Sequence, residues 1–262
     1  MSNPAPNVMP EAAREVVELS LIVPAYNEER RLLPTLQRLH AHLSTQPLTY
    51  EILVVDDGST DGTSAVVEGA RASIANLFLV RQSPNRGKGA AVRRGMLAAT
   101  GRLRVMCDAD CSMPPEQLGR LLGPIEAGRA AIAIGSRYAP GARTAVKQPL
   151  YRVLWSRLCN KVIQRSLVPR ILDTQCGFKA FTAAAAADLF SRATIDGWAF
   201  DLEILAIARR RGLPIEEVGI DWQNDDRSRV SPLRDMVRVI REAMTIRCNL
   251  ARGTYGRLPA RV

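Results

Sequence analysis

Short apolar runs and amphipathic helical patterns alternate along the first half of the chain. The apolar runs are typical of buried strands and lie at 19–24, 51–55, 77–81, 103–107 and 130–135. The helical patterns lie near 28–43, 62–73, 88–100 and 114–128. We expect Asn27 and Asp61 to cap two of these helices. Because parallel strands need long right-handed crossovers, this alternation predicts an α/β fold with a mainly parallel central sheet flanked by helices.

The second half of the chain is less regular. Its patterns predict a basic helix at 149–168, helices near 182–191 and 198–212, a strand near 214–221 and a last helix at 231–250. No Pro/Gly/Ser-rich linker divides the chain. We therefore expect a single domain over residues 19–250, preceded by an N-terminal extension (1–18) and followed by a C-terminal tail (251–262).

The charge of the chain indicates an anionic partner. Lys and Arg number 36 against 26 Asp and Glu, which gives a formal charge of +10. Nucleic acid, an acidic membrane surface and phosphate-bearing substrates all suit this excess. Nucleic acid is disfavoured, because aromatic residues make up only 5% of the chain and no reader motif is present. The sequence has neither the apolar core of a signal peptide nor an apolar run long enough for a transmembrane helix, so we expect a cytoplasmic protein.

Paired carboxylates follow two of the predicted strands, at the edge of a parallel sheet where ligands collect. Asp56 and Asp57 follow one strand. The polar, glycine-containing segment that they begin suits a turn with a helix cap, and a carboxylate there could alternatively accept a hydrogen bond from a nucleobase N–H. Asp108 and Asp110 follow another, on one face and roughly 7 Å apart at Cα. Two carboxylates this close repel each other unless a cation lies beside them. Carboxylate oxygens suit Mg²⁺ or Mn²⁺, which could bridge to a diphosphate. An isolated D-x-D is more commonly an exposed acidic loop.

Lys88 stands between two glycines at the start of a predicted helix. The spacing is not that of a P-loop, which needs an earlier Gly and a Ser or Thr after the Lys. Backbone N–H groups and a Lys at a helix N-terminus still suit a phosphate. The alternative is a flexible glycine turn with a solvated Lys.

The stretch from Ala127 to Leu172 contains nine Lys and Arg residues and no acidic residue. Arg157, Lys161 and Arg165 are spaced by four and form a basic stripe on the predicted helix. One explanation is a helix packed on the sheet with a solvated polar face. The other, which the absence of acidic residues favours, is a helix lying in the plane of a membrane surface with anionic headgroups.

Seven segments together resemble the inverting glycosyltransferases of family 2. They are LIVPAYNEE, VVDDGSTDGT, NRGKGAAVRRG, CDADCS, IGSRY, DTQCGFKAF and WAFDLEILAIA, in this order. Within that family the chain is most similar to dolichyl-phosphate β-glucosyltransferases and their bacterial polyprenyl-phosphate relatives. The resemblance implies the GT-A nucleotide-diphospho-sugar transferase fold. It also implies metal-dependent transfer of a sugar, glucose from UDP-glucose, to a polyprenyl or dolichyl phosphate at the inner face of a membrane.

The resemblance also assigns donor-side roles. Pro24, Tyr26, Glu28 and Asp57 match positions that bind the uracil or its ribose. Asp108 matches a residue near the ribose and metal, Ala109 belongs to the nucleotide-sugar set, and Asp110 matches the metal ligand on the diphosphate. Ser228–Arg229 resembles a mobile Ser-Lys element that clamps the diphosphate. Relatives that use mannose carry Gln where this chain has Ser112.

On the acceptor side, Arg137, Arg152 and Ser156 match the residues that hold the lipid phosphate. A phosphate monoester is largely dianionic at neutral pH, so it can attack the sugar without a protein base. A soluble or cell-envelope hydroxyl acceptor would need a general base, for which Asp201 is the candidate. Asp201 otherwise orients the donor sugar, or is a carboxylate favoured by a helix N-terminus.

Overall fold

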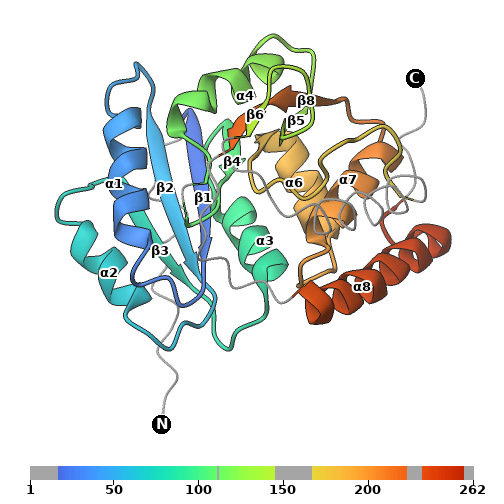
Figure 1. Ribbon diagram of the computed structural model, residues 1–262, viewed down its shortest axis with the longest axis horizontal. Helices are drawn as coiled ribbons and strands as arrows, with labels where there is room; N and C mark the ends of the chain where they lie inside the picture. Colours follow the sequence, from blue (N-terminus) through green and yellow to red (C-terminus); the bar gives the residue numbers. More distant parts are fainter. Residues whose placement is uncertain (1–16, 111, 145–166, 223–231, 257–262) are drawn as a thin grey trace.

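The computed structural model describes residues 17–110, 112–144, 167–222 and 232–256 (Figure 1). Its centre is a seven-stranded sheet in the order β3-β2-β1-β4-β7-β5-β8, and a two-stranded sheet pairs β6 with β9. The strands are β1 (Leu19–Ala25), β2 (Tyr50–Asp56), β3 (Leu77–Arg81), β4 (Leu103–Met106), β5 (Ile132–Ser136), β6 (Arg143–Thr144), β7 (Lys179–Thr182), β8 (Ile215–Gly219) and β9 (Asp221–Trp222). The predicted α/β fold with a mainly parallel sheet is confirmed.

Helices flank the sheet (Figure 1). They are α1 (Leu32–Leu43), α2 (Thr63–Ala70), α3 (Lys88–Ala98), α4 (Leu118–Glu126), α6 (Ala183–Arg192), α7 (Phe200–Arg210) and α8 (Pro232–Arg252), with a 3₁₀ turn, η2 (Pro115–Gln117), before α4. Helix α3 packs against β1, β2 and α6, and α6 packs against α7. Helix α1 packs beside α2, and α4 against β5 and β7. None of the helices among the described residues is both long and apolar enough to cross a membrane.

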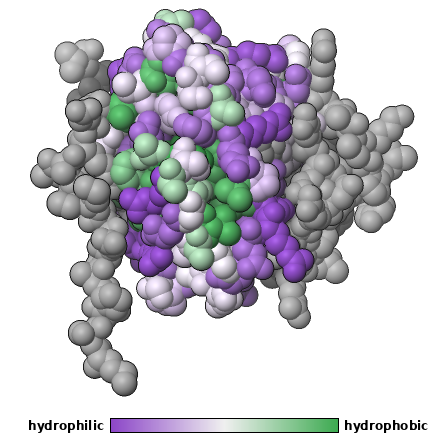
Figure 2. Space-filling view, turned by 90° about the vertical axis from the view of Figure 1, so that its left-hand side faces the viewer, coloured by the Kyte–Doolittle hydropathy of each residue, from purple (hydrophilic) through white to green (hydrophobic). Residues whose placement is uncertain are grey.

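Burial explains why the first elements form. All seven residues of β1 and of β2 are buried, as expected for strands covered on both faces. Helix α1 buries Leu32, Leu36, Leu39 and Leu43 on one stripe, the spacing of an amphipathic helix. On the side of the molecule that carries α1 and α2, hydrophilic residues surround a small apolar area (Figure 2).

Strand β7 was not predicted, and it determines the geometry of the site. It is antiparallel to both β4 and β5, between which it lies. Its four residues, KAFT, are too short to show a strand period inside the DTQCGFKAF segment. The antiparallel register pairs Lys179 with Met106, so β7 begins beside the carboxyl end of β4.

Asn27 does not cap a helix, so that prediction was wrong. It has a positive φ of 56°, and α1 begins only at Leu32. The Asn27 side chain instead accepts a hydrogen bond from the Thr60 N–H at 2.9 Å and so joins two loops. The N-cap position of α2 is occupied by Gly62 and not by Asp61, but the Asp61 carboxylate accepts from the N–H of Thr63, the first residue of α2.

The chain end differs from the expected tail. Helix α8 continues to Arg252, and Tyr255 is fully buried. The Tyr255 hydroxyl donates to the buried Glu203 carboxylate at 2.7 Å. Glu203 also accepts from the N–H groups of Thr194 and Ile195. A single aromatic residue after a helix gives no periodic signal, so this attachment could not be read from the sequence.

Candidate active site

The loops after β1 and β2 are joined at the carboxyl edge of the sheet. The Asn27 N–H donates to Ser59 Oγ at 2.9 Å, and the Glu28 N–H donates to Thr63 Oγ1 at 2.8 Å. The Glu28 carboxylate is paired with Arg31, 2.6 Å from Oε1 to Nη2. These bonds fix the loop that carries the predicted uracil-binding residues.

The remaining predicted uracil-site residues of β1 and its loop lie at different depths. Pro24 is buried within β1, whereas Tyr26 leaves 46% of its surface exposed. Ala109 is buried, and its carbonyl oxygen accepts a hydrogen bond from Thr35 Oγ1 of α1 at 2.7 Å. Of Pro24, Tyr26 and Ala109, only Tyr26 is therefore exposed.

Asp56 and Asp57 are both buried, and their carboxylates organise two loops. Asp56 accepts from the Ser59 N–H and from Ser64, which is the turn arrangement expected as one alternative. Asp57 accepts from Gln82 Nε2 at 2.5 Å, from the Arg86 N–H at 2.9 Å and from the Gly87 N–H at 2.8 Å. Asp57 therefore holds the loop that leads into α3.

That loop places Lys88, the first residue of α3, against Asp108. Lys88 Nζ lies 2.6 Å from Asp108 Oδ1 and 5.5 Å from the centre of the Trp198 ring. Burial alone would lower the pKa of Lys88, but attraction by Asp108 and Asp201 and the hydrogen bond to Asp108 raise it above its usual value. Lys88 is consequently charged, and the solvated-lysine alternative does not hold.

The two D-x-D carboxylates have different surroundings. Asp108 is crowded by the backbone of Gly177, where an added Cβ would lie 2.0 Å from Oδ2. Asp110 Oδ1 accepts from both the N–H and the hydroxyl of Ser112, at 3.0 and 2.6 Å. Ser112 therefore orients Asp110 at the end of β4.

Asp201 lies at the start of α7 and is paired with a residue that the sequence analysis did not single out. Lys179 Nζ donates to Asp201 Oδ1 and, at 2.5 Å, to the Cys176 carbonyl oxygen. Both side chains of the pair are almost fully buried. Burial raises the pKa of Asp201, against the opposing effects of Lys179 and Lys88. No local pattern signals this pair, because β7, which begins at Lys179, is too short to show a strand period.

Arg137, after β5, is bound by another residue that the sequence analysis did not assign. Its Nε and Nη2 lie 2.7 and 2.8 Å from the two oxygens of Asp173, and its N–H donates to Asp173 at 3.0 Å. Asp173 is fully buried. The Arg137 guanidinium also lies 4.9 Å from the centre of the Trp222 ring. Burial would lower the pKa of Arg137, but the Asp173 carboxylate raises it.

The carboxylate set suits a divalent ion shared with a ligand. Within residues 17–110, 112–144, 167–222 and 232–256, no three His, Cys, Asp or Glu side chains group as a metal site. Asp108 and Asp110 remain as a pair, and Mg²⁺ is commonly held by one or two carboxylates together with substrate phosphates. Oxygen donors of this kind also suit Mn²⁺. Arg152, Ser156 and Arg229 lie outside the described residues.

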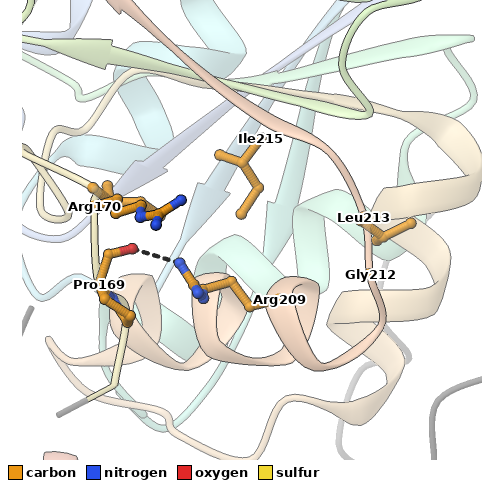
Figure 3. A pocket seen from close by; sticks show the side chains of 7 residues that line it. Pro169, Arg170, Arg209, Gly212, Leu213 and Ile215 are labelled. Atoms are coloured by element: carbon orange, nitrogen blue, oxygen red, sulfur yellow. Dashed lines mark hydrogen bonds between the residues drawn. The ribbon is translucent and has the colours of Figure 1, made fainter. Parts of the chain in front are cut away.

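A pocket separate from these residues lies where α7 ends and β8 begins (Figure 3). It is lined by Pro169, Arg170, Ile171, Arg209, Gly212, Leu213 and Ile215. Arg209 donates a hydrogen bond to the Pro169 carbonyl oxygen across one side of it. None of the residues predicted for the site lines this pocket. Since β8 is parallel to β5, its first residue lies at the sheet edge opposite the carboxylates.

Residues 20–190 match the family model of glycosyl transferase family 2. The chain belongs to glycosyl transferase family 2. The dolichyl-phosphate beta-glucosyltransferase of Trichomonas vaginalis is 36% identical to it over 89% of this chain and 75% of that protein. The Homo sapiens protein of the same name is 33% identical, over 91% of this chain and 77% of that one.

A solved structure shares the fold of this family 2 protein. Glucosyl-3-phosphoglycerate synthase from Mycobacterium tuberculosis, solved with Mn²⁺, UDP-glucose and phosphoglyceric acid, has a TM-score of 0.65 at 20% identity. The match covers 95% of this chain and 84% of that one. The fold is therefore GT-A, and the protein is a glycosyltransferase, as the sequence motifs predicted.

Proposed function

We propose that this glycosyltransferase moves glucose from UDP-glucose to the phosphate of a polyprenyl or dolichyl lipid, with inversion at the anomeric carbon. One observation carries the proposal: the Asp108–Asp110 pair follows β4 and Arg137 follows β5, with only β7 between these strands. Two strand spacings correspond to about 10 Å. A cation-binding group and an anion-binding group thus share one edge of the sheet. The name of the relatives at 33–36% identity supports glucose and dolichyl phosphate as the substrates.

On the donor side, Pro24, Tyr26, Glu28 and Asp57 bind the uridine, and Ala109 belongs to the nucleotide-sugar site. A carboxylate offers about four acceptor positions. The loop before α3 donates three hydrogen bonds to the Asp57 carboxylate, which leaves one acceptor position for the uracil N–H. Lys88 and Arg229 bind the diphosphate.

Asp108 and Asp110 would hold a Mg²⁺ or Mn²⁺ ion. A bound divalent ion neutralises charge on a departing diphosphate. The Mn²⁺ and UDP-glucose named with the M. tuberculosis structure support this assignment. Ser112, through its two bonds to Asp110, keeps that carboxylate directed at the site.

On the acceptor side, Arg137, Arg152 and Ser156 bind the lipid phosphate. Asp173 occupies the Nε–Nη2 edge of Arg137 and so fixes the plane of the guanidinium. The Nη1 side is then the side available to a phosphate oxygen. The dianionic phosphate is itself the nucleophile, and Asp201 orients the donor sugar in this reaction.

The lipid acceptor implies work at a membrane surface. We assign the surface contact to the basic stretch near 149–168, peripheral to the cytoplasmic leaflet, because arginines and lysines attract anionic headgroups. That stretch lies outside the described residues apart from Leu167 and Val168, both of which are buried. Nucleic acid is not among the proposed partners.

A second candidate is transfer to a soluble or cell-envelope hydroxyl with Asp201 as general base. The raised pKa of Asp201 favours it, since a base works best with a pKa near the working pH. The bound Lys179 opposes it, because a carboxylate that accepts from an ammonium is a weaker base.

The two candidate functions are distinguished by the acceptor that receives the sugar and by the effects of two substitutions. Purified protein is incubated with labelled UDP-glucose, Mn²⁺ and either polyprenyl phosphate or a panel of soluble sugars and alcohols. The proposal predicts label in the lipid fraction, loss of transfer in Arg137→Ala, and residual transfer in Asp201→Asn. Label only in soluble products, abolished by Asp201→Asn, would establish the second candidate instead.

A further inference from the structure

The donor side of the site contains an amine in direct contact with a predicted metal ligand. Lys88 Nζ lies 2.6 Å from Asp108 Oδ1, and the two side chains are about four-fifths buried, with exposures of 20% and 23%. Lys88 is also attracted by Asp110 and Asp201. A single ammonium group therefore occupies the field of all three carboxylates.

The charges of this cluster nearly cancel without a metal ion. Three carboxylates, Asp108, Asp110 and Asp201, face two ammonium groups, Lys88 and Lys179. At most one formal negative charge remains. A divalent ion that enters this cluster alone reverses its sign, whereas a diphosphate that enters with the ion restores a negative total.

The surroundings of Asp108 force the two cations to compete. The Gly177 backbone lies close to the Oδ2 side of this carboxylate, since a Cβ added to Gly177 would lie 2.0 Å from Oδ2. Lys88 occupies the Oδ1 side. Among the described residues, no three His, Cys, Asp or Glu side chains are grouped so that they could hold a metal ion by themselves.

We propose that Lys88 is a resident counter-ion of Asp108 in the nucleotide-free enzyme, and that it makes binding of the divalent ion depend on the nucleoside diphosphate sugar. The diphosphate draws Lys88 Nζ away from Asp108 and supplies the oxygen ligands that the protein lacks. The carboxylate then becomes available to the ion. This inference rests on the proposed donor site, and Lys88 acts in it as a positioning residue.

Mn²⁺ binding to the nucleotide-free protein tests the inference without any turnover. Free Mn²⁺ is measured by electron paramagnetic resonance with wild-type protein, Lys88→Met and Lys88→Arg. We expect Lys88→Met to bind Mn²⁺ about tenfold more tightly than wild type, a coupling of ordinary size between two sites. Lys88→Arg, which keeps the charge, should stay within about twofold of wild type. Equal or weaker Mn²⁺ binding by Lys88→Met would overturn the inference.

A second titration separates this inference from the donor site itself. With saturating UDP present, the Mn²⁺ affinity of wild type should rise about tenfold or more, and that of Lys88→Met should rise less. Wild-type protein that binds no UDP would contradict the proposed function. Lys88→Gln replaces Lys88→Met if that variant melts at a lower temperature than wild type, because it also removes the charge.

Discussion

The two halves of the site use charge in different ways. On the β1–β2–β4 side, Lys88 contacts Asp108 and is also attracted by Asp110 and Asp201, so one ammonium group is shared among several carboxylates. On the β5–β8 side, Arg137 is bound to the single carboxylate of Asp173 through two parallel bonds and an additional backbone bond. A shared lysine can be displaced, whereas a bidentate arginine is fixed in place.

This difference matches the two tasks. In the proposed reaction the donor side exchanges an ion and a diphosphate in each cycle, so its charges must rearrange. The acceptor side must present one cation at a constant position to an incoming anion. Burial supports this contrast, because Asp173 is fully buried whereas Asp108 is about one quarter exposed.

Asp110→Asn tests the donor half with the largest expected effect. We expect kcat/KM for transfer from UDP-glucose to fall about 10³-fold, because the charge stabilisation that a metal ion supplies is worth several kcal/mol. The melting temperature should change little. Asp188→Asn is the control, since Asp188 pairs with Arg192 and Arg211 away from the site and its loss should leave transfer unchanged. A near-normal rate in Asp110→Asn would remove the metal from the donor half.

Arg137→Met tests whether the acceptor half is fixed by its ion pair. The variant leaves Asp173 buried and unpaired, so the free energy of unfolding in urea should fall by about 3–5 kcal/mol. Adding Asp173→Asn should recover much of that stability but not the transfer to lipid phosphate. Recovery of transfer in the double variant would mean that Arg137 serves stability alone.

Ser112→Ala tests orientation within the donor half. It removes the 2.6 Å hydroxyl bond to Asp110 and keeps the carboxylate. We expect kcat/KM to fall about tenfold, because a hydrogen bond to a charged group is worth about 1.5 kcal/mol. The conservative Ser112→Thr variant, which keeps the hydroxyl, serves as the control. An unchanged rate in Ser112→Ala would show that Asp110 needs no such support.

Asp201→Asn tests the charge of the buried carboxyl group of Asp201, and its expected effect is the smallest of the four. Burial raises the pKa of Asp201, so the Asp201 carboxyl group binds its proton more tightly in the folded chain than in the unfolded chain. The contribution of this protonated group to the free energy of unfolding is complete below the ordinary carboxyl pKa of about 4. It is lost as the pH rises through the raised pKa. Asp201→Asn should flatten the pH dependence of urea unfolding over that interval. A parallel shift of the whole curve would contradict the direction of the pKa change.

Most of the parallel half followed from the sequence, because strand and helix periods are local. The strand ends that carry Asp57 and Asp108 lie where the apolar runs stop. The partners of the site residues did not follow. Lys179 and Asp173 reach the site only through the antiparallel pairing of β7 and the loop before it, which depend on contacts between distant segments.

Tyr255 and Asn27 show the same limit. Each acts through a partner far away in sequence, Glu203 for the tyrosine and Thr60 for the asparagine. Local composition predicted a tail for one and a helix cap for the other. Tertiary hydrogen bonds decided both.

The phosphorus spectrum of the acceptor tests the central claim most directly. Polyprenyl phosphate is incubated with the protein, UDP-glucose and Mn²⁺, and the lipid is examined by ³¹P NMR. If the lipid phosphate is the nucleophile, its monoester resonance is replaced by that of a glucosyl phosphodiester, and chelation of Mn²⁺ prevents the change. A monoester resonance that persists while UDP accumulates would contradict the account.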